Sequence, residues 1–184
     1  MSCRFPKDRN TPCFRDTLAL LGLDSTCRFG LCVGMELTVR AARLEDLEAM
    51  VELLGRLFGQ EAEFHANPER QRAALRSILA LPDHGSLLVA QWLPEIVGMV
   101  SLHYTISTAE GGTAAWLEDM VVDPRFRGRG VGSRLVEAAF ATCRTKGVRR
   151  VTLLTDKVNA SAQRFYRRHG FAESPMLPMR CRLD

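Results

Sequence analysis

The amino-acid sequence predicts an α/β protein, with a mixed β-sheet of about six to seven strands flanked by about four helices. Several segments of the 184-residue chain carry apolar residues at the three- and four-residue spacing of a helix. Shorter apolar or alternating runs lie between them, and turns rich in glycine, proline or aspartate separate the segments. No apolar run reaches the roughly 20 residues that span a bilayer, so no membrane segment is expected.

The first half of the chain contributes a strand, two helices and a hairpin. A strand is predicted at 37–40, and a helix at 44–58 carries its apolar residues on one face. A second helix at 68–80 opens with proline, which suits the first helical turn. Strands at 86–92 and 95–105 are separated only by a Leu-Pro turn, so they are expected to pair as a hairpin.

The second half alternates strands and helices. A strand at 116–122 leads into a glycine-rich loop, and a helix at 133–146 follows it. A buried strand at 150–155 precedes a helix at 160–168, which begins after a capping asparagine. Two short strands, at 171–173 and 178–183, close the predicted sheet. The order of elements is β-α-α-β-β-β-α-β-α-β-β.

Residues 1–34 differ from the rest of the chain and are expected to form a poorly ordered N-terminal extension. Their single short apolar patch is too weak for the core of a signal peptide. Aspartates at positions 8, 16 and 24 argue against a transit peptide, which is poor in acidic residues. The folded domain is therefore predicted to span 35–184.

The six cysteines are scattered, at positions 3, 13, 27, 32, 143 and 181. A zinc site would need a second closely spaced pair besides 27 and 32, and a disulfide framework would need a denser pattern. The sequence therefore predicts no metal site and favours a reducing, cytoplasmic location.

Charge is distributed unevenly along the chain. Residues 41–120 hold 12 acidic and 5 basic side chains, whereas residues 121–184 hold 5 acidic and 14 basic ones. A basic C-terminal half suits an anionic cofactor, and the acidic middle would attract a cationic substrate. Two differently solvated surfaces would explain the same asymmetry. The arginines lack the aromatic interleaving and helix-turn-helix spacing of nucleic-acid binding, so that partner is not expected.

The most informative stretch is 121–132, in which an apolar strand ends in Asp-Pro and a basic loop carries glycines at 128, 130 and 132. Glycine lets the backbone approach a ligand closely and adopt conformations closed to other residues. The first turn of the following helix adds unpaired N–H groups and the positive end of its dipole. Strand, loop and helix together predict a nest for phosphate oxygens.

Two common phosphate-binding loops do not fit this stretch. A Walker A loop ends in Gly-Lys-Ser/Thr, whereas this loop ends in Gly132-Ser133-Arg134. A Rossmann loop reads G-x-G-x-x-G, with an acidic residue about twenty positions on. Here the glycine spacing is G-x-G-x-G, and the first plausible acid, Asp156, stands at the far end of the next strand.

Two blocks of the sequence match a third pattern. Residues 127–132 match R/Q-x-x-G-x-G/A, and residues 159–171 match N-x-x-A-x-x-F-Y-x-x-x-G-F. In this order and separation the blocks resemble those of the GNAT superfamily of acetyl-CoA-dependent N-acetyltransferases. The resemblance covers about 35–184. It implies a GNAT-like fold and acetyl-CoA as the acyl donor.

The resemblance also implies which residues contact the donor. The end of the strand at 116–122 would offer backbone groups to the pantetheine arm, by analogy with the addition of a strand to a sheet. The loop amides would hold the pyrophosphate, and the asparagine before the last helix would contact the donor near the pantetheine. The predicted cofactor-binding residues are Met120, Val121, Val122, Arg127, Gly128, Arg129, Gly130, Val131, Gly132, Ser133 and Asn159.

Tyr166 is the predicted general acid. A phenol, with an ordinary pKa near 10, can donate a proton to the sulfur of the departing coenzyme. The alternative is a packed aromatic residue beside Phe165.

Glu118 is the predicted general base, with Asp119 in a structural role. An alkylammonium substrate must lose a proton before its nitrogen can attack a thioester, and a nearby carboxylate assists that loss. Alternation along a strand would point these neighbouring side chains to opposite faces, so one of them would face the cleft. The Leu117–Asp119 segment resembles the corresponding strand of polyamine and glucosamine-phosphate acetyltransferases of the superfamily. Ordinary charges at a strand end are the alternative.

These features predict an N-acetyltransferase that moves an acetyl group directly from acetyl-CoA to a small, cationic primary amine within a ternary complex. The alternatives are an acyltransferase for another acyl-CoA and a non-catalytic sensor that binds coenzyme A. The acceptor region, 44–80 and the loops around it, carries no motif that would name the amine. The sequence leaves room for a homodimer.

Overall fold

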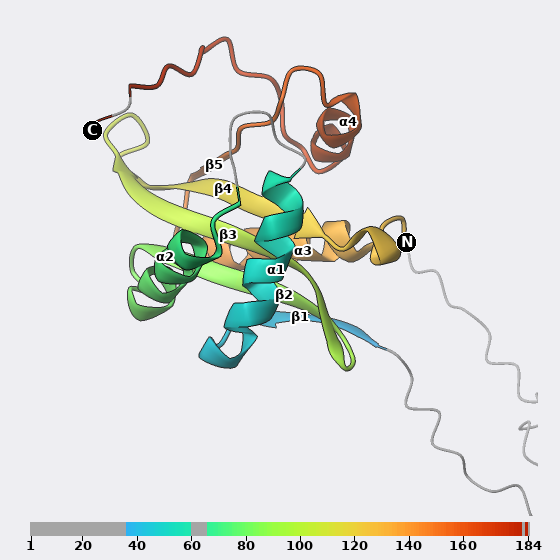
Figure 1. The fold of residues 1–184 in the computed structure, drawn as a ribbon. Coiled ribbons are helices and arrows are strands. Elements are labelled where there is room, and N and C mark those ends of the chain that lie inside the picture. The colour runs from blue at the N-terminus through green and yellow to red at the C-terminus, as the bar shows by residue number, and fades with distance from the viewer. Residues whose placement is uncertain (1–35, 60–65, 182, 184) are drawn as a thin grey trace, which may run out of the picture. The chain divides into compact units, whose positions relative to one another are not determined.

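The computed structural model describes residues 36–59, 66–181 and 183, so the predicted N-terminal extension, 1–34, lies outside the described residues. Figure 1 shows the elements in chain order. The strands are β1 (Leu37–Ala41), β2 (Gly85–Trp92), β3 (Glu95–Ser107), β4 (Gly112–Val122) and β5 (Arg150–Thr152). The helices are α1 (Leu47–Phe58), α2 (Pro68–Ala80), α3 (Val131–Thr145) and α4 (Ala160–Arg168), with short 3-10 helices η1 (Leu44–Asp46) and η2 (Pro124–Phe126).

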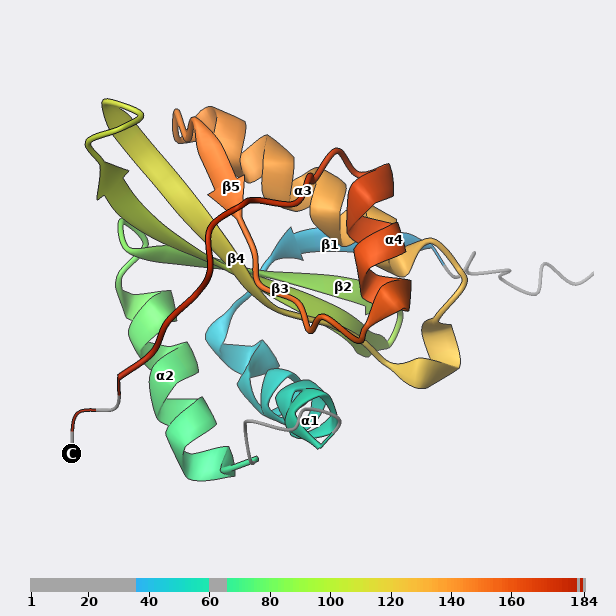
Figure 2. The same cartoon turned by 90° about the horizontal axis from the view of Figure 1, so that it is seen from above.

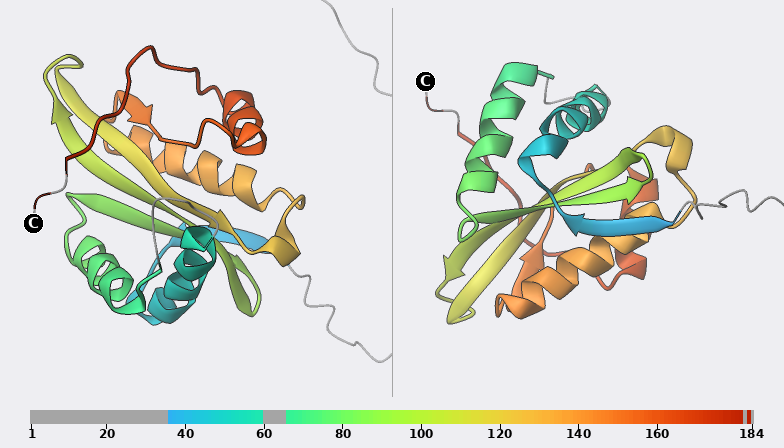
Figure 3. Two further views of the ribbon diagram at one scale, coloured as in Figure 1. Left: turned by 45° about the horizontal axis from the view of Figure 1, so that its top comes forward. Right: turned by 90° about the horizontal axis from the view of Figure 1, so that it is seen from below.

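The described strands form one mixed sheet in the order β1-β2-β3-β4-β5. Strands β1 to β4 pair antiparallel, and β5 joins β4 in parallel. Helices α1 and α2 cover one face of the sheet and α3 covers the other, as Figures 2 and 3 show from several sides. The mixed α/β class and the four helices that the sequence predicts are confirmed.

Alternate residues of the central strands supply a separate core on each face. On the α3 face, Val100 and Leu102 of β3 pack in one cluster with Leu135. On the α1 and α2 face, Met99 of the same strand packs in a second cluster with Met50. Because helices cover both faces, the middle of β3 is buried on both sides.

The edge of β4 that faces β5 is paired along less than half of its length. Strand β5 pairs only with Ala114–Trp116, at the beginning of β4. From Leu117 to Val122, no strand of the described residues pairs with this edge. The far half of β4 therefore has backbone groups on one edge that no neighbouring strand satisfies.

A bulge interrupts the pairing of β3 with β4 in the same half. Ser101 pairs with Glu118, and the next pair in the register joins Met99 to Val121. Two residues of β4 therefore stand opposite one residue of β3, which is the definition of a bulge. The first of them, Asp119, has φ +50°, in the left-handed region. After the bulge, the alternation of side chains between the two faces of the sheet is reversed along β4.

The C-terminal part of the predicted sheet is wrong. From 171 onward no described residue belongs to a strand, so the predicted strands at 171–173 and 178–183 are not found, although 182 lies outside the described residues. The described residues form a sheet of five strands. Prolines at 175 and 178 lack the N–H that a ladder needs, which weakens any strand there. Strand β5 is also shorter than its prediction of 150–155. None of the described helices is long and apolar enough to cross a membrane.

Candidate active site

The glycine loop between η2 and α3 takes a conformation that requires glycine at two positions. Gly128 has φ +75° and Gly130 has φ +81°. A Cβ built at either residue would meet nothing within 4 Å, so the space beside these residues is open. Gly130 is the N-cap of α3 and no side chain caps this helix. The N–H groups of its first turn are thus left for another acceptor. This open backbone cradle fits a phosphate group.

The third glycine has a different role, because it lets three elements meet. A Cβ at Gly132, in the first turn of α3, would lie 3.3 Å from the ring of Phe165 and 3.4 Å from Cε of Met120. These neighbours belong to α4 and β4. The predicted cofactor-binding residues of the loop, of β4 and of α3 are therefore brought together beside the helix that carries Tyr166.

Two arginines of the loop are held by neighbouring groups. Nε of Arg127 donates to the carbonyl oxygen of Val122 over 3.2 Å. The guanidinium of Arg129 lies 5.7 Å from the ring centre of Trp92 and 5.5 Å from that of Phe126. Such cation–π contacts are attractive. Both arginines keep positive charge next to the cradle.

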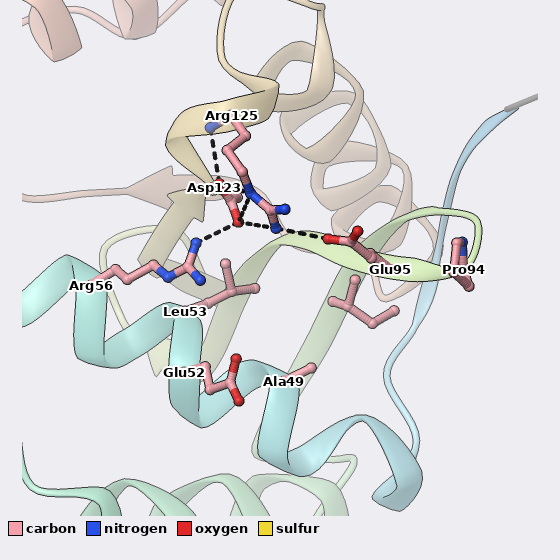
Figure 4. Close-up of a pocket in the computed structure, with 9 residues that line it drawn as sticks. Ala49, Glu52, Leu53, Arg56, Pro94, Glu95, Asp123 and Arg125 are labelled. Atoms are coloured by element: carbon pink, nitrogen blue, oxygen red, sulfur yellow. Dashed lines mark hydrogen bonds and ion pairs between the residues drawn. The ribbon is translucent and has the colours of Figure 1, made fainter.

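Asp123, at the end of β4, fixes the start of the loop. Its buried carboxylate accepts hydrogen bonds from the backbone N–H of Arg125 (2.9 Å), from the guanidinium of Arg125 and from Arg56 of α1. Arg125 also pairs with Glu95, and Figure 4 shows this cluster in a surface pocket of about 310 Å³. Its hydrogen bonds, above all those from Arg125, lower the pKa of Asp123 to about 2. A carboxylate held in the charged form so firmly is a structural anchor, not a base.

Helix α4 places Tyr166 inside an aromatic cluster. The Oδ1 of Asn159 accepts from the N–H of Ala162 over 3.0 Å, so this predicted cofactor contact caps α4. The ring centre of Tyr166 lies 5.2 Å from that of Phe165 and 5.7 Å from that of Phe171. Burial raises the pKa of Tyr166 to about 12, so its phenol stays protonated at neutral pH.

The two carboxylates of β4 lie in a line of polar groups that spans β3 and β4. The hydroxyl of Ser101 donates to Oδ2 of Asp119 over 3.3 Å, and Nε2 of His103 lies 3.2 Å from the same hydroxyl oxygen. Nε2 of His103 is also 3.9 Å from Oε2 of Glu118. Burial, and then the charge of Glu118, raises the pKa of Asp119.

The expectation that Glu118 and Asp119 point to opposite faces is wrong. In a regular strand Leu117 and Val121, four residues apart, would share a face. Leu117 instead packs in the α3-side core and Val121 in the α1-side core. The bulge between them adds one residue and so reverses the alternation of side chains along β4. Both carboxylates therefore reach the same line of polar groups as Ser101 and His103.

The sequence reasoning missed three contributors to this region: the serine and histidine of β3, and the histidine that follows α4. Ser101 and His103 stand two apart in β3, directly after the apolar run 96–100, so they share one face. This spacing of two polar residues could have indicated a polar site on that face of the sheet. His169 lies 3.1 Å, through Nε2, from the hydroxyl of Ser133 in the first turn of α3. Within the described residues, no three His, Cys, Asp or Glu side chains are grouped so that they could hold a metal ion.

Curated proteins similar to this chain carry N-acetyltransferase names. It is 30% identical over 139 residues to the uncharacterized N-acetyltransferase YhfO of Bacillus subtilis, covering 74% of this chain and 91% of that one. It is 28% identical over 141 residues to the uncharacterized N-acetyltransferase MJ1207 of Methanocaldococcus jannaschii. That match covers 76% of this chain but only 62% of MJ1207.

Two further relatives are named for their substrates. The aminoalkylphosphonate N-acetyltransferase of Salmonella typhimurium is 29% identical over 136 residues, covering 74% of this chain and 85% of that protein. The glucosamine 6-phosphate N-acetyltransferase of Trypanosoma brucei is 29% identical over 144 residues, covering 74% and 90%. Relatives of this chain thus act on small amines of differing chemistry.

The fold is similar to that of solved structures, and a family model matches most of the domain. The integron cassette protein HFX_CASS3, from the mobile metagenome of Cole Harbour Salt Marsh, superposes with a TM-score of 0.70 at 28% identity, covering 79% of this chain and 90% of that one. The model of the acetyltransferase (GNAT) family matches residues 47–171. With its glycine cradle, half-paired β4 and tyrosine-bearing α4, the chain belongs to the acetyltransferase (GNAT) family.

Proposed function

We propose that this N-acetyltransferase takes its acetyl group from acetyl-CoA and transfers it directly to the primary amine of a small, cationic substrate. The observation that carries the proposal is the uncapped start of α3, which follows two glycines in the left-handed region and adjoins a half-paired β4. This combination offers N–H groups to a diphosphate and a strand edge to an extended amide-containing arm.

The donor would be held by backbone and by the aromatic end of α4. The residues from Arg127 to Ser133 would surround the diphosphate, and those from Met120 to Val122 would face the pantetheine arm. Asn159, whose oxygen caps α4, keeps its amide N–H₂ for the same ligand. Bound in this way, acetyl-CoA supplies an activated carbonyl carbon for attack by the amine.

Two groups would handle the protons of the reaction. Tyr166 would protonate the departing thiolate, because burial keeps its phenol in the acid form. A carboxylate of β4, with Glu118 as the candidate from the sequence, would accept the proton that the ammonium group must lose. Attack within a ternary complex needs no acetylated side chain. Cys143 is buried, and burial raises its pKa, which suits a packing role.

The acidic pair on β4 favours a cationic acceptor, in agreement with the acidic middle of the chain. The named relatives act on amines that also carry phosphonate or phosphate, so the test must include that class. A cytoplasmic location belongs to the same proposal.

The donor is tested by thermal unfolding with acetyl-CoA, succinyl-CoA and NAD. A ligand that binds only the native state raises its stability by mass action. We expect stabilisation by the coenzyme A esters and none by NAD. A shift with NAD alone would contradict the proposed donor.

The reaction is tested by thiol release over a panel of polyamines, aminoglycosides, aminoalkylphosphonates and amino-sugar phosphates. We expect turnover with cationic members of the panel. Turnover only with phosphate-bearing amines would overturn the cationic acceptor while preserving acetyl transfer. Binding of acetyl-CoA without thiol release from any amine would favour the sensor instead.

A further inference from the structure

Four polar side chains form a line on one face of β3 and β4, in which the last step, from His103 to Glu118, is longer than a hydrogen bond. It runs from Asp119 through Ser101 and His103 to Glu118, with separations of 3.3, 3.2 and 3.9 Å. Ser101 has no exposed surface, whereas the side chains of His103 and Glu118 are 35% and 53% exposed. The line therefore begins at a partly buried carboxylate, that of Asp119, and ends in solvent.

The bulge is what brings the buried end of this line into the half-paired part of β4. Asp119 and the next residue, Met120, stand where the register shifts, and Asp119 adopts φ +50°. Its carboxylate reaches Ser101, while Met120 lies near Phe165 of α4 across Gly132. The carboxylate of Asp119 thus lies on one side of β4, and helix α4, which carries Tyr166, the proposed acid, lies on the other.

Asp119 is better suited than Glu118 to take a proton and pass it on. A partly buried carboxylate that hydrogen-bonds to the neutral hydroxyl of Ser101 gains more from neutralisation than one in water. The charged groups that act on Asp119 are Glu118 of β4 and His103 of β3. Glu118 is half exposed and can exchange protons directly with solvent.

We propose that Asp119 accepts the proton of the substrate ammonium group, and that Ser101 and His103 relay it to Glu118 and solvent. This inference rests on the proposed acetyl transfer and assigns its base. The carboxylate gains one proton as the N–H bond of the ammonium breaks, and the nitrogen keeps the electron pair. Neutral Asp119 then donates to Oγ of Ser101, and the hydroxyl hydrogen passes to Nε2 of His103, which becomes an imidazolium. The imidazolium returns to neutral by releasing one proton, either from Nε2 to Glu118 or from Nδ1 to water.

The test compares Asp119→Asn with Glu118→Gln in the full chain, by the pH dependence of kcat/KM. Asparagine keeps the shape of aspartate and tolerates a left-handed φ, so the bulge is preserved. Losing a general base typically costs 10²–10⁴-fold in rate. We expect a loss of about 10²-fold or more near pH 7 in Asp119→Asn, and a loss below about tenfold in Glu118→Gln.

A base is distinguished from a structural residue by recovery at high pH. As the pH approaches the pKa of an alkylamine, near 10.4, the substrate deprotonates in solution and the missing base matters less. The kcat/KM of Asp119→Asn should therefore climb toward that of the wild type, with an unchanged Kd for acetyl-CoA. A deficit that stays constant at every pH would overturn the assignment, as would a larger loss in Glu118→Gln.

The relay is tested separately by Ser101→Ala and His103→Gln. Each should lower kcat/KM by an intermediate factor, about 5- to 50-fold, and the double variant should lose no more than the worse single one. Ser86→Ala is the matched control, because Ser86 is a strand serine that accepts from Tyr104 outside this line. If kcat/KM were unchanged in both variants, Ser101 and His103 would not belong to the proton path. A wild type that releases no thiol from any amine would instead refute acetyl transfer itself.

Discussion

The hydroxyl of Ser133 and Nε2 of His169 lie 3.1 Å apart, and this contact joins the first turn of α3 to the end of α4. The imidazole also packs against Phe165, with ring centres 4.7 Å apart and the ring planes tilted by 55°. Ser133 is one of the residues proposed to face the diphosphate. The histidine is therefore placed to orient a hydroxyl at the cradle without touching the loop itself.

Replacing His169 by phenylalanine should weaken the binding of acetyl-CoA. The new ring keeps the packing against Phe165 but cannot hydrogen-bond to Ser133. Losing a neutral hydrogen bond costs about 1 kcal/mol, so Kd should rise about fivefold in calorimetry. Ser133→Ala should produce a similar increase, and the double variant should add little to either. Fully additive effects would show that the two residues act independently.

Gly130→Ala should also weaken the binding of acetyl-CoA, because alanine resists the left-handed φ of +81°. A relaxed loop would no longer align the N–H groups of the first turn, and we expect Kd to rise at least tenfold. Gly147→Ala is the matched control. Gly147 has φ +66° just beyond α3, so the substitution costs similar stability, but it lies at the opposite end of that helix from the cradle. Equal effects of both variants on Kd would contradict the role of the loop.

Tyr166→Phe should lower kcat by about 10²-fold, since the phenol would no longer protonate the departing thiolate. The aromatic packing with Phe165 and Phe171 is kept, so both the unfolding temperature and the Kd for acetyl-CoA should stay close to those of the wild type. Stopped-flow measurement of thiol release separates this step from binding. Unchanged turnover would leave Tyr166 with a packing role.

Asp123→Asn should destabilise the fold and change how its stability depends on pH. The pKa of Asp123 is about 2 in the folded chain and ordinarily 3.8, so its stabilisation is present above about pH 4 and is lost as the pH falls toward 2. Losing its charge-assisted hydrogen bonds should cost about 1–3 kcal/mol at pH 7. Urea unfolding from pH 2.5 to 7 should show a flatter pH dependence in the variant. If the free energy of unfolding of the variant depended on pH as steeply as that of the wild type, other carboxylates would be responsible for the pH dependence.

Much of this architecture could be predicted from the chain, because its signals are local. Periodicity indicated the helices at 44–58 and 133–146, and Pro68 and Asn159 marked the starts of the other two, which the structure confirms. The glycines at 128 and 130 indicated a left-handed loop. Each of these depends on a few neighbouring residues.

The bulge and the sheet edge could not be predicted, because they depend on pairing between distant segments. The segment Leu117–Val121 carries two polar and then two apolar neighbours, a break in alternation that does not by itself identify a bulge. The extra residue is identified only by the register of β4 with β3. The apolar residues near the C-terminus suggested further strands, yet Met176 and Met179 are highly exposed and unpaired with the sheet. Likewise, Asp123 and Arg56 are 67 positions apart, so no local pattern joins them.

The half-paired edge of β4 has a consequence for handling the protein. Exposed backbone donors and acceptors along a strand invite other chains to add to it, which is a common route to aggregation. An acyl donor lying along Leu117–Val122 would cover these unpaired backbone groups. Adding excess acetyl-CoA while the protein is concentrated should therefore reduce aggregation, because the bound donor would cover the unpaired strand edge.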